Sequence, residues 1–141
     1  MKLEKMQRRA LRIVLKDHSS SYKTLLENAN VPSLYVSRIH NIGIETYKSI
    51  HGINPKFLHD IVTFNNTSYD LRDNMKCIQP KVNSTTYGLN SFKYECTRIW
   101  NEIPIEIKQM ESLPSFISHI RNWPGPQCSC GHCILCKIGL L

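Results

Sequence analysis

The chain of 141 residues has the size of one ordinary domain and is long enough to bury a real hydrophobic core. Its 41% hydrophobic and 21% charged residues are close to globular averages, which excludes wholesale disorder and fibrous repeats. The formal net charge of +7 at pH 7 is concentrated near the N-terminus and indicates a polyanionic partner.

The N-terminal stretch MKLEKMQRRALRIVLK does not resemble a secretory signal, because charged residues interrupt it throughout. No apolar run in the sequence reaches the length of a membrane span. We therefore expect an intracellular protein, nuclear or cytoplasmic, with no membrane partner. Thiols stay reduced in these compartments, so stable disulfides are not expected. The glycosylation sequons at Asn65, Asn66 and Asn83 are then chance matches.

Residues 2 to 16 are predicted to form an amphipathic helix with two distinct faces. One face is the apolar stripe, which consists of Leu3, Met6, Ala10, Ile13 and Val14. The other is the basic stripe, which we define as Lys2, Lys5, Arg8, Arg9, Arg12 and Lys16. A solvated helix face usually carries charges of mixed sign, whereas Glu4 is the only acidic residue in this segment. The basic stripe is therefore the candidate nucleic-acid-binding site, where each bound phosphate releases condensed counterions.

Three more helices are expected in the N-terminal half. The serines of SSSY precede KTLLENAN, a short helix that Pro32 ends. A longer helix runs from residue 33 to about residue 51, with Gly52 as its stop. Asn54 and Pro55 form a cap and first-turn pair that opens a short helix through KFLHDIV.

Beyond this point the sequence loses its helical period and becomes polar, with one or two short strands expected around residues 75 to 82. Helical spacing then returns as a pair of helices, and a PGPQ turn leads into a Cys-rich tail. The predicted fold class is mainly α, a small helical domain. It has four parts: a helical segment (1–62), an irregular connection (63–90), a helical pair (91–123) and the Cys-rich tail (124–141).

The tail contains CSCGHCILC, in which four cysteines and one histidine occupy nine positions. The candidate metal ligands are Cys128, Cys130, Cys133 and Cys136, because zinc accepts four thiolates tetrahedrally. Four-cysteine zinc sites usually separate two pairs by roughly a dozen or more residues, whereas here two pairs share one cysteine. His132 could replace a strained sulfur. The alternatives are a partial site completed by another chain and idle thiols.

Catalytic chemistry has little basis in the sequence. Asp70 and Asp73 lie three residues apart in the irregular connection, and no adjacent aspartate pair offers ligands for two-metal phosphoryl transfer. Cys77 and Cys96 are expected to be core thiols. Most aromatic residues that could stack on bases are also expected in the core; these are Tyr22, Tyr35, Tyr47, Trp100 and Trp123.

The runs RALR, PSL, YGLNSF and IWNEIP occur in this order and are followed by GPQCSCGHC. This series resembles the C-terminal region of reverse transcriptases of animal non-LTR retrotransposons of the jockey type. The resemblance covers about residue 3 to Cys136. It implies the thumb-side part of an RNA-directed DNA polymerase, whose helices grip template and primer through phosphates. It also includes a closing cysteine cluster, which favours zinc in the tail.

The aromatic-Ala-Asp-Asp signature of the polymerase palm is absent from the sequence, so no catalytic residue of the family can be placed here. The expected function is that of a C-terminal fragment that binds nucleic acid but lacks the polymerase active site. Magnesium is implied only for the full-length enzyme. The missing palm domain is an expected partner, which the apolar stripe would contact. The alternative is a self-contained regulatory or interaction module that binds zinc and nucleic acid.

Overall fold

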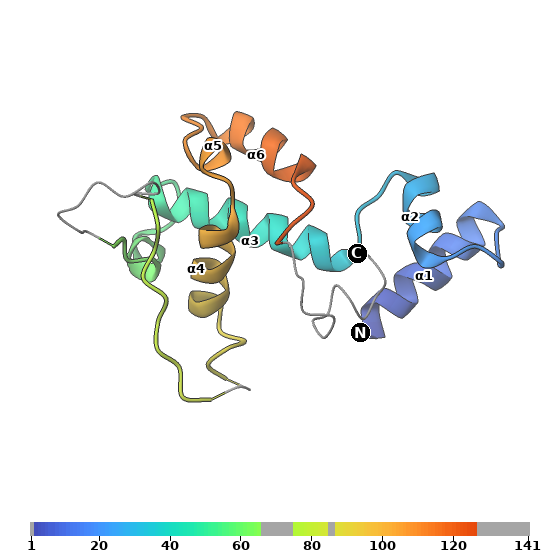
Figure 1. Cartoon of the computed structure of the whole chain (residues 1–141), viewed down its shortest axis with the longest axis horizontal. Coiled ribbons are helices and arrows are strands. Elements are labelled where there is room, and N and C mark those ends of the chain that lie inside the picture. Colours follow the sequence, from blue (N-terminus) through green and yellow to red (C-terminus); the bar gives the residue numbers. More distant parts are fainter. Residues whose placement is uncertain (1, 66–74, 85–86, 127–141) are drawn as a thin grey trace. The chain divides into compact units, whose positions relative to one another are not determined.

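The computed structural model of the chain describes residues 2–65, 75–84 and 87–126 (Figure 1). These residues form six α-helices and one 3₁₀ helix, and no strand, which confirms the mainly α fold. They divide into two compact units, the first extending to Arg38 and the second formed by Ile39–Pro126. This division falls inside helix α3 (Leu34–Ile50), whereas the sequence division at residue 62 follows a change in composition.

The first unit contains α1 (Lys2–Leu15) and α2 (Tyr22–Ala29), which pack against each other. Ser21 caps α2 as the sequence predicts, because its side chain accepts a hydrogen bond from the backbone N–H of Thr24 at 3.2 Å. The helix predicted through KTLLENAN is confirmed. The helix stops at Asn30, which adopts a left-handed conformation with φ 51°, before Pro32 is reached.

The turn between α1 and α2 is organised by Asp17. One oxygen of its carboxylate accepts hydrogen bonds from the backbone N–H groups of Ser19 and Ser20, each at 3.0 Å. Hydrogen bonds from Ser20, and then from Ser19, lower the pKa of Asp17 from 3.8 to about 2. Lys16, directly after α1, adopts a φ of 52° and so redirects the chain into this turn.

Two polar side chains of α1 cap the start of α3. Gln7 accepts from the backbone N–H of Leu34 at 3.2 Å, and Glu4 accepts from that of Tyr35 at 2.8 Å. The hydroxyl of Tyr22 donates to both Glu4 and Gln7. Burial, and then the hydrogen bond to the Glu4 carboxylate, raise the pKa of Tyr22 above its ordinary value. The unpaired N–H groups of a helix start are thereby satisfied from another helix. This network turns Glu4 and Gln7 of α1 toward Tyr22 and the start of α3.

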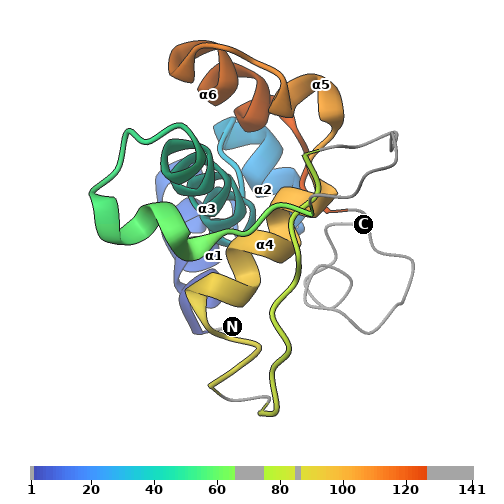
Figure 2. The same ribbon diagram turned by 90° about the vertical axis from the view of Figure 1, so that its left-hand side faces the viewer.

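The second unit is built around the part of α3 that follows Ile39. Helix α4 (Phe92–Glu102) crosses α3 steeply, and α6 (Leu113–Asn122) is inclined to α3 (Figures 1 and 2). A short α5 (Ile105–Lys108) connects the two. Ser91 and Ser112 cap α4 and α6 through their side chains. The apolar core of this unit consists of Ile39, Ile44, Tyr47, Val62, Cys77, Cys96, Ile99, Trp100, Ile103, Phe116 and Ile120.

Aromatic rings link the three long helices of the second unit. The ring of Phe116 stacks on that of Tyr47 with centroids 4.2 Å apart, and lies 6.2 Å from that of Trp100. The Tyr47 hydroxyl donates to the backbone carbonyl of Met110 at 2.7 Å. Gly43 lets α3 and α6 approach, because a Cβ there would collide with the side chain of Ile120. These contacts fix how α4 and α6 pack on α3.

The short strands expected around residues 75 to 82 are not present in the described residues, where the only pairing is an isolated antiparallel bridge between Phe64 and Cys77. A side chain replaces the missing strand partner. Asn101 accepts from the backbone N–H of Cys77 at 2.8 Å and donates to its carbonyl at 2.9 Å. The Trp100 indole also donates to the Met75 carbonyl at 2.9 Å. These bonds hold the connection on α4.

Two short elements differ from the predictions. The short helix predicted through KFLHDIV is present as a 3₁₀ helix, η1 (Lys56–Ile61), but its cap position is Pro55 and not Asn54. Asn54 instead directs its side-chain amide back to the carbonyl of Glu45 at 3.2 Å. Helix α5, which begins after Pro104, was not predicted, because its four residues are too few to show a hydrophobic period.

Candidate nucleic-acid interface

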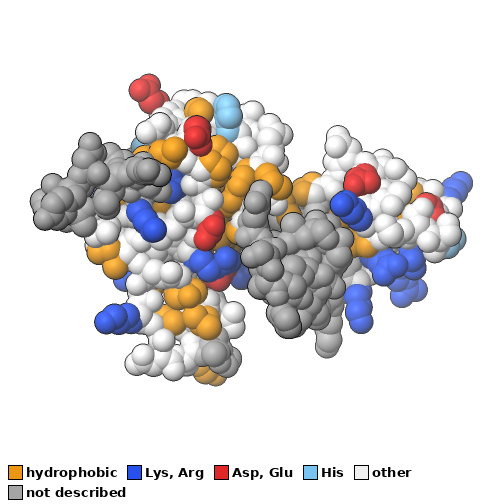
Figure 3. Space-filling view, viewed as in Figure 1, with side chains coloured by type: hydrophobic (Ala, Val, Ile, Leu, Met, Phe, Trp, Pro, Cys, Tyr) orange, Lys and Arg blue, Asp and Glu red, His pale blue; other side chains and the backbone are white. Residues whose placement is uncertain are grey.

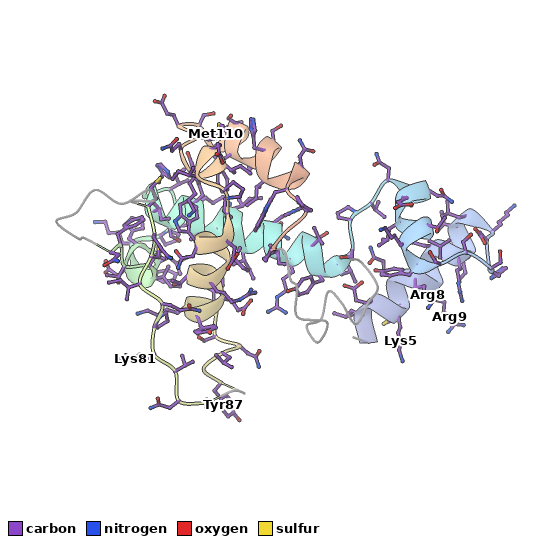
Figure 4. All side chains as sticks on the ribbon, viewed as in Figure 1. Lys5, Arg8, Arg9, Lys81, Tyr87 and Met110 are labelled. Atoms are coloured by element: carbon purple, nitrogen blue, oxygen red, sulfur yellow. The ribbon has the colours of Figure 1, made fainter. Side chains whose placement is uncertain are left out.

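The basic stripe lies on the outside of α1. Lys5, Arg8, Arg9 and Lys16 are exposed, and Figure 4 shows the first three projecting from the same side of the helix. Lys and Arg side chains also gather over α1 in the space-filling view (Figure 3). Arg12 is half-buried, and Lys2 belongs to the helix although its side chain is not described. The structure thus brings the predicted residues together on one helix.

Within residues 2–65, 75–84 and 87–126, no carboxylate forms an ion pair with a residue of the stripe. The ion pairs in the described part of the chain join Lys48 to Glu45 and Arg98 to Glu95, both in the second unit. Glu4, the one acidic residue of α1, is turned toward Tyr22 and the start of α3. An unneutralised row of cations on one helix face is suited to phosphate groups spaced along a nucleic-acid backbone.

Arg12 differs from the rest of the stripe. Its Nε atom is buried and has no hydrogen-bond partner among the described residues. Burial of an N–H without an acceptor costs about 1–3 kcal/mol. Arg12 is therefore less available to a phosphate than Lys5, Arg8 and Arg9.

The aromatic candidates fall into two groups. Tyr47 and Trp100 are buried in the core of the second unit, as expected. Tyr22, Tyr35 and Trp123 are only partly exposed, and the hydroxyl of Tyr22 is engaged by Glu4 and Gln7. None of the five predicted candidates offers a fully exposed ring.

Sequence reasoning missed Tyr87, which is 85% exposed and lies at the end of the loop before α4 (Figure 4). The turn that presents it is closed by hydrogen bonds from the backbone N–H of Gly88 to the Ser84 hydroxyl at 3.0 Å and of Leu89 to the Ser84 carbonyl at 3.2 Å. The charge of the surrounding sequence could have pointed to Tyr87. Residues 75 to 94 contain no Asp or Glu, although they contain three lysines.

The predicted zinc ligands, Cys128, Cys130, Cys133 and Cys136, lie outside the described residues, as does His132. Within residues 2–65, 75–84 and 87–126, no three His, Cys, Asp or Glu side chains gather as metal ligands would. Cys77 and Cys96 are buried in the core of the second unit, as expected. Burial raises the pKa of Cys96, so this thiol is a core residue and not a nucleophile.

Three histidine side chains donate hydrogen bonds to backbone carbonyls. His40 donates from Nε2 to Trp123 at 2.8 Å, and His59 donates from Nε2 to Asn54 at 2.6 Å. His119 donates from Nδ1 to Ser115 at 2.8 Å. These contacts give the histidines structural roles within the second unit. Asp70 and Asp73, the acidic residues weighed as catalytic candidates, lie outside the described residues.

Comparisons with known proteins add no relative: no family model, curated protein or solved structure matches the chain. Among the described residues, no helix combines the length and the apolar character that crossing a membrane requires.

The motifs that carry the resemblance hold structural positions. In PSL, the Pro32 carbonyl accepts a hydrogen bond from Gln7, and Leu34 begins α3. In IWNEIP, Trp100 is buried and Asn101 holds the backbone of Cys77. RALR differs, because it contributes Arg9 and Arg12 to the basic stripe.

Proposed function

We propose that the chain is a C-terminal segment of a non-LTR retrotransposon reverse transcriptase that acts inside the cell, binds nucleic-acid backbone through the basic stripe and contributes no polymerase active site. The observation that supports this proposal is the exposed row of Lys5, Arg8 and Arg9 on α1, with Lys16 directly after the helix and Glu4 turned away from the row. Phosphate contacts of this kind carry no base identity, so binding shows little sequence preference. The palm domain of the parent polymerase is a second proposed partner.

The basic stripe is tested by changing its four exposed residues, Lys5, Arg8, Arg9 and Lys16, to Gln in the full chain. We expect weaker binding to a mixed-sequence duplex and a salt dependence that is flatter by about 0.9 in slope per lost phosphate contact. Fluorescence anisotropy at several salt concentrations measures both quantities. A control variant changes Lys48, Lys56 and Arg121, all in the second unit, to Gln and should keep the original slope. If the stripe variant keeps it too, α1 is a solvated surface.

We also propose a structural zinc ion held by Cys128, Cys130, Cys133 and Cys136, on the basis of their spacing and the resemblance. Protein purified under reducing conditions without added metal should contain about one zinc per chain. Changing Cys130 and Cys133 to Ser should remove it, whereas changing the buried Cys96 to Ala should not. Elemental analysis decides the question, and a zinc content near zero with every thiol titratable would reject the site.

A further inference from the structure

Helix α1 exposes the face that a helix ordinarily buries. Within the apolar stripe, Leu3, Met6, Ile13 and Val14 are 67%, 67%, 64% and 75% exposed. Ala10, at the centre of the stripe, is also exposed. Single exposed apolar residues are common on protein surfaces, but four large ones aligned on one helix indicate a contact surface.

The spacing of the apolar stripe is that of a seam between two helices. Leu3, Met6, Ala10 and Ile13 follow one another at steps of three, four and three residues, which are the a and d positions of a heptad repeat. The small side chain of Ala10 allows a second helix to approach closely at the centre. Side chains at a and d positions insert between residues of a facing helix, which gives the stripe a specific type of occupant.

The two borders of the seam differ in charge. Lys2 and Arg9 occupy the g positions of this heptad, and Lys16 follows at the same spacing directly after the helix. The e positions on the other border hold Gln7 and Val14, which are uncharged. Side chains at g positions face the border residues of the partner helix, so acidic residues there would complement Arg9.

We propose that the apolar stripe binds an amphipathic helix of a partner protein whose own apolar seam is bordered by Asp or Glu. A second copy of this chain complements the seam poorly. Antiparallel pairing would set Arg9 and its basic neighbours against each other, and parallel pairing would set them against the uncharged Gln7 and Val14. An anionic bilayer is less suited than a helix, because the cations border only one side of a surface one seam wide.

Binding of a partner helix is a second role for α1 besides nucleic-acid binding, although the apolar stripe and the basic stripe are adjacent on the helix. Arg9 belongs to the basic stripe and also borders the apolar stripe. An acidic partner helix that pairs with Arg9 withdraws this residue from phosphate. The partner and a nucleic acid therefore compete for α1, and the partner would lower nucleic-acid affinity when bound.

The test uses the full chain and a synthetic helical peptide of about three heptads with Leu at its a and d positions and Glu at e and g. A control peptide carries Lys in place of every Glu. Isothermal titration calorimetry should show the Glu peptide binding at least about 10-fold more tightly than the Lys peptide. The preference should shrink as salt is raised, because exposed charges are screened.

Two pairs of variants locate the binding surface. Changing Met6 and Ile13 together to Gln should weaken the Glu peptide by roughly 100-fold, since two apolar side chains no longer enter the seam. Phe57→Gln removes a 79% exposed apolar residue from the second unit and should change nothing. Arg9→Gln should weaken the same peptide by about 2- to 5-fold, whereas Lys23→Gln on α2 should not.

Three outcomes would overturn the proposal. If the Glu and Lys peptides bind equally, or if neither binds, an acidic partner helix is rejected. A dimer of the chain that the Met6 and Ile13 variant abolishes assigns the stripe to a second copy. Binding to phosphatidylglycerol vesicles, lost in that variant and without peptide binding, assigns it to a bilayer. The affinity of the Met6 and Ile13 variant for a DNA duplex should stay unchanged. Each of these three outcomes would therefore reject the partner helix without rejecting nucleic-acid binding by the basic stripe.

Discussion

The two compact units use apolar surface in opposite ways. In the first unit, α1 turns its apolar stripe to solvent and directs Glu4 and Gln7 inward. In the second, Tyr47, Trp100 and Phe116 are almost completely buried and stacked. The second unit thus gains most of its stability from burial of apolar surface. The first unit buries Leu25 and Leu26 of α2, but it positions α1 at the start of α3 through hydrogen bonds and leaves the apolar stripe of α1 exposed.

The largest expected difference between the units follows from removing one large apolar side chain from each. Phe116→Ala should lower the free energy of unfolding of the second unit by about 3–5 kcal/mol, because it leaves a cavity beside Tyr47 and Trp100. Met6→Ala should change stability by no more than about 0.5 kcal/mol. Denaturant unfolding is followed by tryptophan fluorescence, which reports on the second unit because it contains both tryptophans, and by far-UV circular dichroism, which reports on the helices of both units. A comparable loss in both variants would contradict the comparison.

A smaller effect is expected from the polar network of the first unit. Glu4→Ala removes the acceptor of the Tyr22 hydroxyl and of the Tyr35 backbone N–H, which should cost about 1–3 kcal/mol. Hydrogen exchange at the Tyr35 amide should accelerate, while the amides of α6 keep their rates. Glu27→Ala, an exposed carboxylate on α2, serves as the control. Unchanged exchange at Tyr35 would show that the network does not hold α3.

The smallest effect is a dependence on pH in the second unit. Burial lowers the pKa of His40 below its ordinary value of 6.5, the bond to the Trp123 carbonyl acts in the opposite direction, and Arg121 lowers it further. The unfolded chain binds a proton at His40 before the folded chain does, so this stabilisation is complete above pH 6.5 and is lost as the pH falls below it. His40→Gln should reduce the slope of stability between pH 7 and about pH 5. A slope identical to that of the original chain would exclude this role.

The helices themselves could be predicted from the sequence because their start signals are local. Ser21, Ser91 and Ser112 each cap a helix through their own hydroxyls, and the hydrophobic period follows directly. The extent of α2 agrees with the predicted run KTLLENAN, but the residue that ends the helix is Asn30, in a left-handed conformation, and not Pro32. The 3₁₀ form of η1 also has no separate signature in so short a segment.

The residues of the basic stripe could be predicted from the sequence, but the orientation of α1 and the exposure of Tyr87 could not. Periodicity separated the basic and apolar stripes of α1 correctly, but it could not show which side of the helix would face α2. That choice depends on Glu4 bonding to Tyr35, a contact 31 residues away along the chain. Tyr87 was missed for a similar reason, because its exposure results from how Ser84 closes the turn. Such contacts are tertiary and leave no local pattern.

The bond between His40 and Trp123 joins residues 83 positions apart, whereas the contacts of Glu4 with Tyr35 span 31. On a ribosome, the first unit can therefore assemble while most of the second unit has not yet been synthesised. The second unit must wait for α6 and Trp123 to emerge before its core closes. During that interval the apolar stripe of α1 is already formed and open, so a partner helix could bind the nascent chain before its synthesis ends.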